Sequence, residues 1–146
     1  MSVPCFSERE SDVGQSGYIL EVTAATNRGL VRRTNEDAIL AEQWVGLGDA
    51  DSHVITRSSF VDVLLAVADG VGGHNAGEIA SQLVVERLSL MKSSLAVGDI
   101  DAATSAIMCV DEDLRAKASS HPSLFNMAST LAMALVSPDA LTISNV

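Results

Sequence analysis

The sequence has 146 residues, of which 47% are hydrophobic and 19% are charged, so it can bury a core and is not a disordered chain. With 19 acidic and 9 basic residues, its formal net charge is -10. Such a charge repels phosphate backbones and anionic lipid headgroups, which argues against nucleic-acid binding and membrane-surface binding.

The N-terminal segment, residues 1–17, is rich in Ser, Gly and Glu and is expected to be a disordered tail. It lacks the basic start and apolar run of a secretion signal. No apolar stretch in the sequence approaches the length of a membrane span. We therefore expect a cytoplasmic protein whose residues 18–146 form one domain.

The first part of this domain is predicted to be β-structure. Residues 18–25 alternate between apolar and polar side chains, which favours a strand, and a turn is expected at residues 27–29. A second strand is predicted to begin near Asp37. Residues 43–59 are expected to form a loop, with a short strand at residues 54–56.

That loop contains three side chains that could bind a metal, Asp49, Asp51 and His53. Their spacing lacks the glycine that a calcium-binding loop requires. A solvated loop is therefore the preferred interpretation.

Residues 60–68 are almost continuously apolar, which predicts a central buried strand that ends at Asp69 and Gly70. A helix is predicted from about Ala76. A second helix is expected to begin at a cap formed by Asp99 or Asp101 and to stop before Pro122. The expected apolar stripes are Ile79, Leu83, Val84, Leu88 and Met91 on the first helix, and Ile100, Ala103, Ile107, Val110 and Leu114 on the second.

Residues 127–136 and 140–146 are predicted to be two further strands, joined by a turn at residues 137–139. The order is then three strands, two helices and two strands. Short connections favour antiparallel pairing, and the expected fold class is α+β.

The first cluster of polar residues places arginines beside carboxylates. Arg32 and Arg33 are followed closely by Glu36 and Asp37. The planar guanidinium of Arg suits phosphate, and carboxylate oxygens suit Mg²⁺ or Mn²⁺. An ordinary surface turn with ion pairs would have the same composition.

The second cluster follows the predicted buried strand, where rigid sheet structure holds a side chain in place. It runs from Asp69 and Gly70 through Gly72, Gly73 and His74. A carboxylate and a nearby carbonyl could bind cations there. The glycines could also form a simple strand-to-helix turn, and a nucleotide-binding loop is only weakly supported because the spacing is not GxGxxG.

Together, the two clusters resemble the motifs of the metal-dependent type 2C serine/threonine protein phosphatases, the PPM family, in its bacterial form. Residues 32–37 match R-x-x-N-E-D, and residues 69–81 match D-G-x-G-G-H-x-A-G-E-x-A-S. Residues 127–130 are a weaker match to M-G-T-T, with Ala128 in place of the usual Gly. The resemblance implies a partial PPM-type four-layer sandwich, in which helices flank two antiparallel sheets.

The resemblance also implies roles for individual residues and a cofactor of two divalent cations, Mn²⁺ or Mg²⁺. Arg32 would bind the substrate phosphate, and Asp69 would bridge the two cations with the Gly70 carbonyl on one of them. Glu36 would hold a metal directly or through water, with Asp37 behind it. The expected substrates are phosphorylated proteins of bacterial signalling, with a serine/threonine kinase as a possible partner.

Two departures from the family pattern affect these expectations. Eukaryotic members have a His directly after the Asp-Gly pair, where this sequence has Val71. His74 is then a candidate for proton transfer, with a structural role in the turn as the alternative. The later G-D-S-R, Asp-Gly and G-x-x-D-N segments do not occur, so we expect a domain that is truncated at its C-terminal side and inactive as this fragment. The alternative is a non-catalytic regulatory or binding module that retains the phosphatase fold.

Overall fold

The computed structural model describes residues 18–48, 53–57, 62–72 and 76–146. The expected tail, residues 1–17, lies outside this part of the chain, as do Asp49, Asp51 and His74. The elements, in chain order, are β1 (Leu20–Ala24), β2 (Asp37–Ala41), β3 (Trp44–Leu47), β4 (His53–Arg57), β5 (Val63–Val71), α1 (Ala76–Met91), η1 (Lys92–Ser94), α2 (Ile100–Ser120), η2 (Pro122–Leu124), β6 (Ala128–Ser129), β7 (Ala132–Val136) and β8 (Leu141–Asn145).

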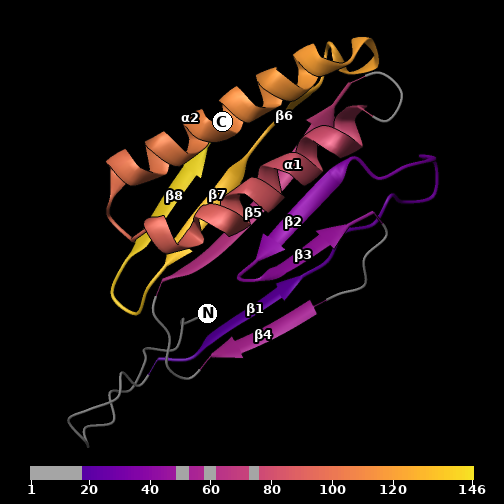
Figure 1. The fold of residues 1–146 in the computed structure, drawn as a ribbon. Helices are drawn as coiled ribbons and strands as arrows, with labels where there is room; N and C mark the ends of the chain where they lie inside the picture. Colours follow the sequence, from indigo (N-terminus) through magenta and orange to yellow (C-terminus); the bar gives the residue numbers. More distant parts are fainter. Residues whose placement is uncertain (1–17, 49–52, 58–61, 73–75) are drawn as a thin grey trace, which may run out of the picture.

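The strands form two antiparallel sheets (Figure 1). The larger sheet has the order β3-β2-β5-β7-β8, and β6 pairs with the end of β5. The smaller sheet consists of β1 and β4. The expected α+β class with antiparallel sheets and helices is thus confirmed.

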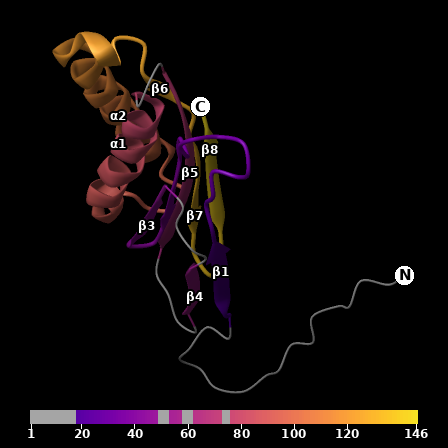
Figure 2. The same cartoon turned by 90° about the vertical axis from the view of Figure 1, so that its right-hand side faces the viewer.

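The centre of the larger sheet is β5, as its apolar sequence predicts. Leu64, Ala66 and Ala68 are almost fully buried and belong to the core cluster that includes residues of both long helices. Side chains alternate between the two faces of a strand, so Leu65 and Val67 point to the opposite face. Both helices lie on one side of the sheet, and β1 lies on the other (Figure 2).

The predicted stripe of α1 is only partly correct. Val84 and Leu88 are buried as expected, but Ile79, Leu83 and Met91 are half-buried. Much of the buried surface of α1 consists of small side chains, at Ala76, Gly77, Ala80 and Ser81. Small residues let the helix lie close to β5, because less volume separates the two backbones.

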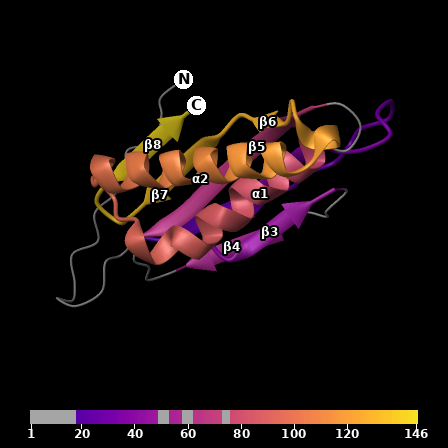
Figure 3. The same cartoon turned by 45° about the horizontal axis from the view of Figure 1, so that its top comes forward.

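The second helix, α2, runs alongside α1 on the same side of the sheet (Figure 3). Asp99 is its cap, because its carboxylate accepts a hydrogen bond from the amide of Ala102 at 2.8 Å. The predicted stripe was wrong at Ile100, whose first-turn side chain is 69% exposed. Ala106 is buried and was not predicted. No helix in the described ranges combines the length and apolarity needed to cross a membrane.

The predicted strand boundaries require three corrections. The expected loop at residues 43–59 contains β3 in addition to β4, because β3 pairs with β2 across a tight turn at Glu42 and Gln43. The central strand β5 does not end at Asp69 but continues to Val71. Residues 127–136 form two strands instead of one, because β6 pairs only with the far end of β5.

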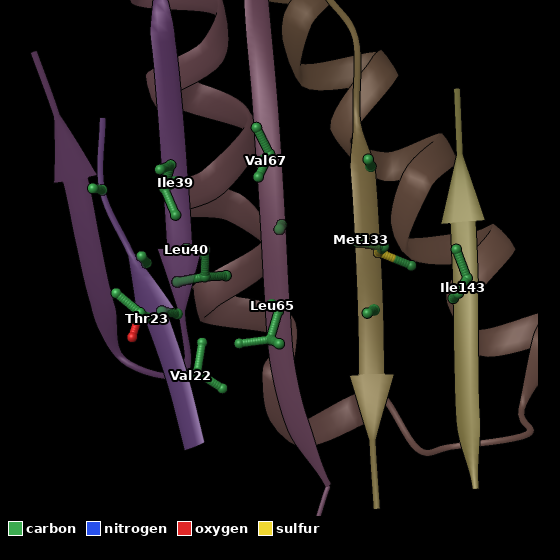
Figure 4. Close-up of a pocket in the computed structure, with 14 residues that line it drawn as sticks. Val22, Thr23, Ile39, Leu40, Leu65, Val67, Met133 and Ile143 are labelled. Carbon is green, nitrogen blue, oxygen red and sulfur yellow. The ribbon is translucent and has the colours of Figure 1, made fainter. Parts of the chain in front are cut away.

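The face of the larger sheet that lies away from the helices is largely apolar and exposed. We call it the open face, and it carries Val67, Ala132, Ala134, Leu141 and Ile143. A groove of ≈ 450 Å³ runs along it, between β1 and strands β2, β5, β7 and β8 (Figure 4). Val67 is 50% exposed and Ile143 is 69% exposed, so the described residues leave much of this apolar surface in contact with solvent.

Candidate metal and phosphate site

At one end of the open face, neighbouring strands bring two carboxylates together. The antiparallel register of β2 and β5 places Asp37 directly opposite Asp69. Because the two positions form a cross-strand pair, both side chains project from the same face of the sheet, which is the face that also carries Val67. Asp69 lies within β5, so the sheet fixes its backbone more firmly than a position after the strand would.

The proximity of these groups changes the protonation of Asp37. Burial raises the pKa of the Asp37 carboxyl, and the neighbouring Asp69 carboxylate raises it further by repulsion and by a shared hydrogen bond. Glu36 adds a smaller upward effect, and the Arg32 guanidinium opposes these effects. Negative charge is therefore concentrated at this point, and a cation bound there would relieve the repulsion.

Glu36 and Gly70 meet beside this pair. The amide of Gly70 donates a hydrogen bond to the Glu36 carbonyl at 3.0 Å. Gly77, in the first turn of α1, packs against both residues. A Cβ added to Gly77 would lie 2.8 Å from the Gly70 carbonyl oxygen and 2.9 Å from Oε1 of Glu36. The Glu36 carboxylate and the Gly70 carbonyl thus border the same small volume, which only a glycine at position 77 leaves open.

The backbone of Asp69 is held from its other side by Ser129 and Thr130. The amide of Asp69 donates to Oγ1 of Thr130 at 3.2 Å, and the amide of Thr130 donates to the Asp69 carbonyl at 2.9 Å. Oγ of Ser129 donates to the same carbonyl at 3.2 Å. The sequence motif at residues 127–130 gave no indication of this role, which depends on the pairing of β6 with β5.

Asn35 anchors the site, a role that the sequence reasoning did not assign to it. Its side chain is buried, and its Nδ2 donates to Oγ1 of Thr26 and to the Gly48 carbonyl, each at 2.6 Å. Its Oδ1 accepts from the amide of Asp37 at 3.1 Å. Asn35 therefore ties three segments together directly before the carboxylates. Its place inside R-x-x-N-E-D was the available signal.

Arg32 lies in the exposed loop between β1 and β2. Its positive charge lowers the pKa of Asp37, so its guanidinium acts on the carboxylate pair. The loop is ordered by local hydrogen bonds, because the amide of Gly29 donates to Oδ1 of Asn27 at 2.8 Å and Nη1 of Arg28 donates to the Arg33 carbonyl at 3.4 Å. Gly29 has φ 73°, a conformation that favours glycine.

Comparison with known sequences identifies the family. Residues 44–146 match the family described as Protein phosphatase 2C. The chain belongs to this family. It is 33% identical over 124 residues to the serine/threonine protein phosphatase PstP of Mycobacterium tuberculosis, a match that covers 84% of this chain and 20% of that protein. It is 28% identical over 126 residues to the serine/threonine phosphatase stp of Listeria innocua, covering 83% of this chain and 44% of the relative.

Solved structures of type 2C phosphatases share the fold. The catalytic domain of PstP in complex with two manganese ions superposes with a TM-score of 0.64 at 29% sequence identity. This match covers 88% of the present chain and 47% of the solved one. The chain thus spans less than half the length of the type 2C phosphatases named here. The expected relationship to bacterial type 2C phosphatases is confirmed.

The donor set of this type 2C domain fits a hard divalent cation. Glu36, Asp37 and Asp69 supply carboxylate oxygens, and Gly70 supplies a carbonyl oxygen, which are the ligands that Mg²⁺ and Mn²⁺ prefer. Across the described part of the chain, no three or more Asp, Glu, His or Cys side chains come together as a group that could hold a metal ion.

Replacement of Asn35 by alanine is expected to destabilise the protein by roughly 2–3 kcal/mol, because it leaves the Gly48 carbonyl, the Thr26 hydroxyl and the Asp37 amide without their partner. Chemical denaturation monitored by circular dichroism would measure the loss. Asn126→Ala is the matched control, since Asn126 is exposed. Equal stabilities of the two variants would contradict the anchoring role of Asn35.

Proposed function

We propose that the protein hydrolyses phosphoserine and phosphothreonine esters on proteins, with two divalent cations, Mn²⁺ or Mg²⁺, as cofactor. The observation that carries this proposal is the meeting of Asp37 and Asp69 on the open face, with Arg32 acting on the same pair. A carboxylate pair for cations beside a guanidinium for phosphate is the combination that metal-assisted ester hydrolysis requires. The relatives named as serine/threonine phosphatases support the same reaction.

In this proposal each residue has a separate task. Asp69, whose backbone β5, Ser129 and Thr130 hold in position, would bind both cations. The Gly70 carbonyl and Glu36 would be further ligands, Glu36 directly or through water, and Asp37 would support Asp69 through their shared hydrogen bond.

Arg32 binds two phosphate oxygens of the substrate with its planar donors. When bound, the cations supply an activated water and neutralise the charge of the phosphoryl oxygens. His74 stays a candidate for proton transfer, with a structural role in the turn as the alternative.

We further propose that residues 18–146 belong to one phosphatase domain after an N-terminal tail, and that the chain acts in the cytoplasm on targets of a serine/threonine kinase. The 146 residues by themselves should turn over substrate slowly, because they hold two of the family's metal-binding segments, at residues 32–37 and 69–81, without the later ones. One observation favours a second candidate, a non-catalytic module that retains the fold: the described residues contain no group of three or more Asp, Glu, His or Cys side chains that could hold a metal ion.

The test uses the 146-residue chain, Mn²⁺ and a fluorescent peptide whose phosphothreonine is replaced by a phosphonate that resists hydrolysis. We expect binding that requires Mn²⁺ and that weakens about tenfold or more in Arg32→Ala, as loss of a charge-assisted hydrogen bond predicts. Arg33→Ala is the control, because it removes the same charge one residue away.

Turnover of p-nitrophenyl phosphate is measured in parallel. Fast Mn²⁺-dependent turnover would show that the 146 residues are active and would contradict only the slow-turnover proposal. A chain that binds neither Mn²⁺ nor the phosphonate peptide would contradict the hydrolase and favour the non-catalytic module.

A further inference from the structure

Two apolar side chains protrude fully from the loop that carries Arg32. Leu30 is 105% exposed and Val31 is 94% exposed, the highest values among the large exposed hydrophobic residues of the described chain. A single exposed aliphatic residue is common on protein surfaces, but two adjacent ones offer apolar area whose burial against a ligand would be favourable. We call these two residues the Leu30–Val31 tip.

The tip lies in an unusually basic segment. Arg28, Arg32 and Arg33 surround it, so six consecutive positions hold three of the nine basic residues of a chain whose net charge is -10. The acidic remainder of the surface repels anions, whereas this loop attracts them. The loop thus combines apolar contact area with attraction for a negatively charged ligand.

The loop that carries the tip is anchored beside the carboxylate pair. Asn35 anchors the end of the loop by its bonds to Thr26, Gly48 and the amide of Asp37. The loop extends past the end of the sheet at which β2 begins and β5 ends (Figure 1), and this is the end that holds Asp37 and Asp69. A ligand whose phosphate reaches Arg32 would therefore pass beside the tip.

We propose that the Leu30–Val31 tip is a specificity surface that contacts apolar side chains flanking the phosphorylated residue of a protein substrate. This inference rests on the proposed phosphatase function and assigns the substrate class: phosphoserine or phosphothreonine in a segment with aliphatic or aromatic neighbours. The phosphate meets Arg32, and the neighbouring side chains cover Leu30 and Val31 from water. Polar neighbours would leave the tip exposed and bind more weakly.

An anionic membrane is the other ligand that a basic and apolar loop could contact. The net charge of -10 opposes the approach of the whole molecule to such a surface. A short phosphorylated peptide places far less negative charge near the acidic remainder of the protein than a membrane surface does. The charge distribution therefore favours a peptide ligand over a membrane.

The experiment compares two phosphonate peptides that differ only in the residues beside the phosphothreonine analogue, which are leucine in one and glycine in the other. Fluorescence anisotropy with the 146-residue chain and Mn²⁺ gives both dissociation constants. The test variant combines Leu30→Ser with Val31→Ser. Leu90→Ser is the matched control, because Leu90 is 73% exposed on α1 and lies outside the loop. Circular dichroism confirms that each variant is folded.

We expect the wild-type chain to prefer the leucine-flanked peptide by roughly five- to tenfold, the gain from partial burial of one or two aliphatic side chains. The double variant should lose this preference and bind both peptides as the wild type binds the glycine-flanked one, whereas Leu90→Ser should retain it. An unchanged preference in the double variant would overturn the inference while leaving the proposed function intact.

Two further arms separate the alternatives. If Arg32→Ala binds both peptides as well as the wild type does, the proposed function itself fails, whatever the tip does. Sedimentation with vesicles containing anionic phosphatidylserine tests the membrane. Vesicle binding that the double variant loses, together with equal binding of the two peptides, would overturn the inference and assign the tip to a lipid surface.

Discussion

Replacement of Asp69 by alanine is expected to weaken Mn²⁺ binding by more than about 100-fold. This loss would exceed the one that follows removal of a residue that only supports a metal ligand. Asp69 is the carboxylate at which the elements of the candidate site converge: it faces Asp37 across the sheet, and Ser129 and Thr130 hold its backbone. Without it, Asp37 would lose the carboxylate that it faces across the sheet, and a cation would have to bind to Asp37 and Glu36 alone. Isothermal titration calorimetry with manganese chloride would measure the change.

The fold should tolerate this substitution. The Asp69 side chain is exposed, and the hydrogen bonds that secure residue 69 to residues 129 and 130 use its backbone. Removal of one of two repelling carboxylates should leave the stability of the metal-free protein equal or slightly higher.

Asp139→Ala is the matched control, because it removes the same charge from the turn after β7, at the other end of the sheet. Equal Mn²⁺ affinities of the two variants would show that Asp69 is not a metal ligand.

Sequence patterns were sufficient for the parts of the site that depend on neighbouring residues. Apolar runs predicted β5, and the short polar motifs marked Arg32, Glu36 and Asp69. The antiparallel register then placed Asp37 opposite Asp69. Charged side chains are costly to bury, so carboxylates and arginines at the end of an apolar strand have no place in the hydrophobic core. The local motifs could therefore mark them as candidate site residues.

The contacts that hold the site depend on residues distant in the sequence, and these were not predictable. Asn35 and Gly48 meet because β2 and β3 form a hairpin, and Ser129 reaches Asp69 because β5 continues past its apolar run. Gly70 has no hydrophobic side chain to reveal its strand. A Cβ at position 70 would overlap the Gly77 carbonyl. Glycine is therefore required there by the close packing of β5 against α1, and strand propensity does not predict it.

The helices illustrate the same limit. The stripe of large apolar residues predicted for α1 assumed that bulky side chains would make the contact with the sheet. Instead, Ala80 and Ser81 are almost completely buried, while Leu83 is only half-buried. Helix periodicity identifies an apolar face, but the distance between helix and sheet decides whether large or small residues occupy its centre.

The second prediction with a large expected effect concerns the open face: we expect the chain to associate with itself as the salt concentration rises. Val67, Leu141 and Ile143 present apolar side chains to solvent on this face, and β8 is an edge strand of the sheet. Exposed apolar patches and unpaired strand edges promote association. The net charge of -10 opposes it, and this repulsion reaches about 30 Å at 0.01 M salt but only about 3 Å at 1 M.

Sedimentation velocity at these two salt concentrations is therefore expected to show mainly monomer at low salt and a weight-average mass at least twice as large at high salt. Ile143→Glu should suppress the increase, because it places a charge in the middle of the apolar surface on β8. Leu90→Glu is the control, since it adds the same charge on α1 and should associate as the wild type does. A wild-type chain that stays monomeric at both salt concentrations would mean that the exposed apolar area of the open face is too small to drive association.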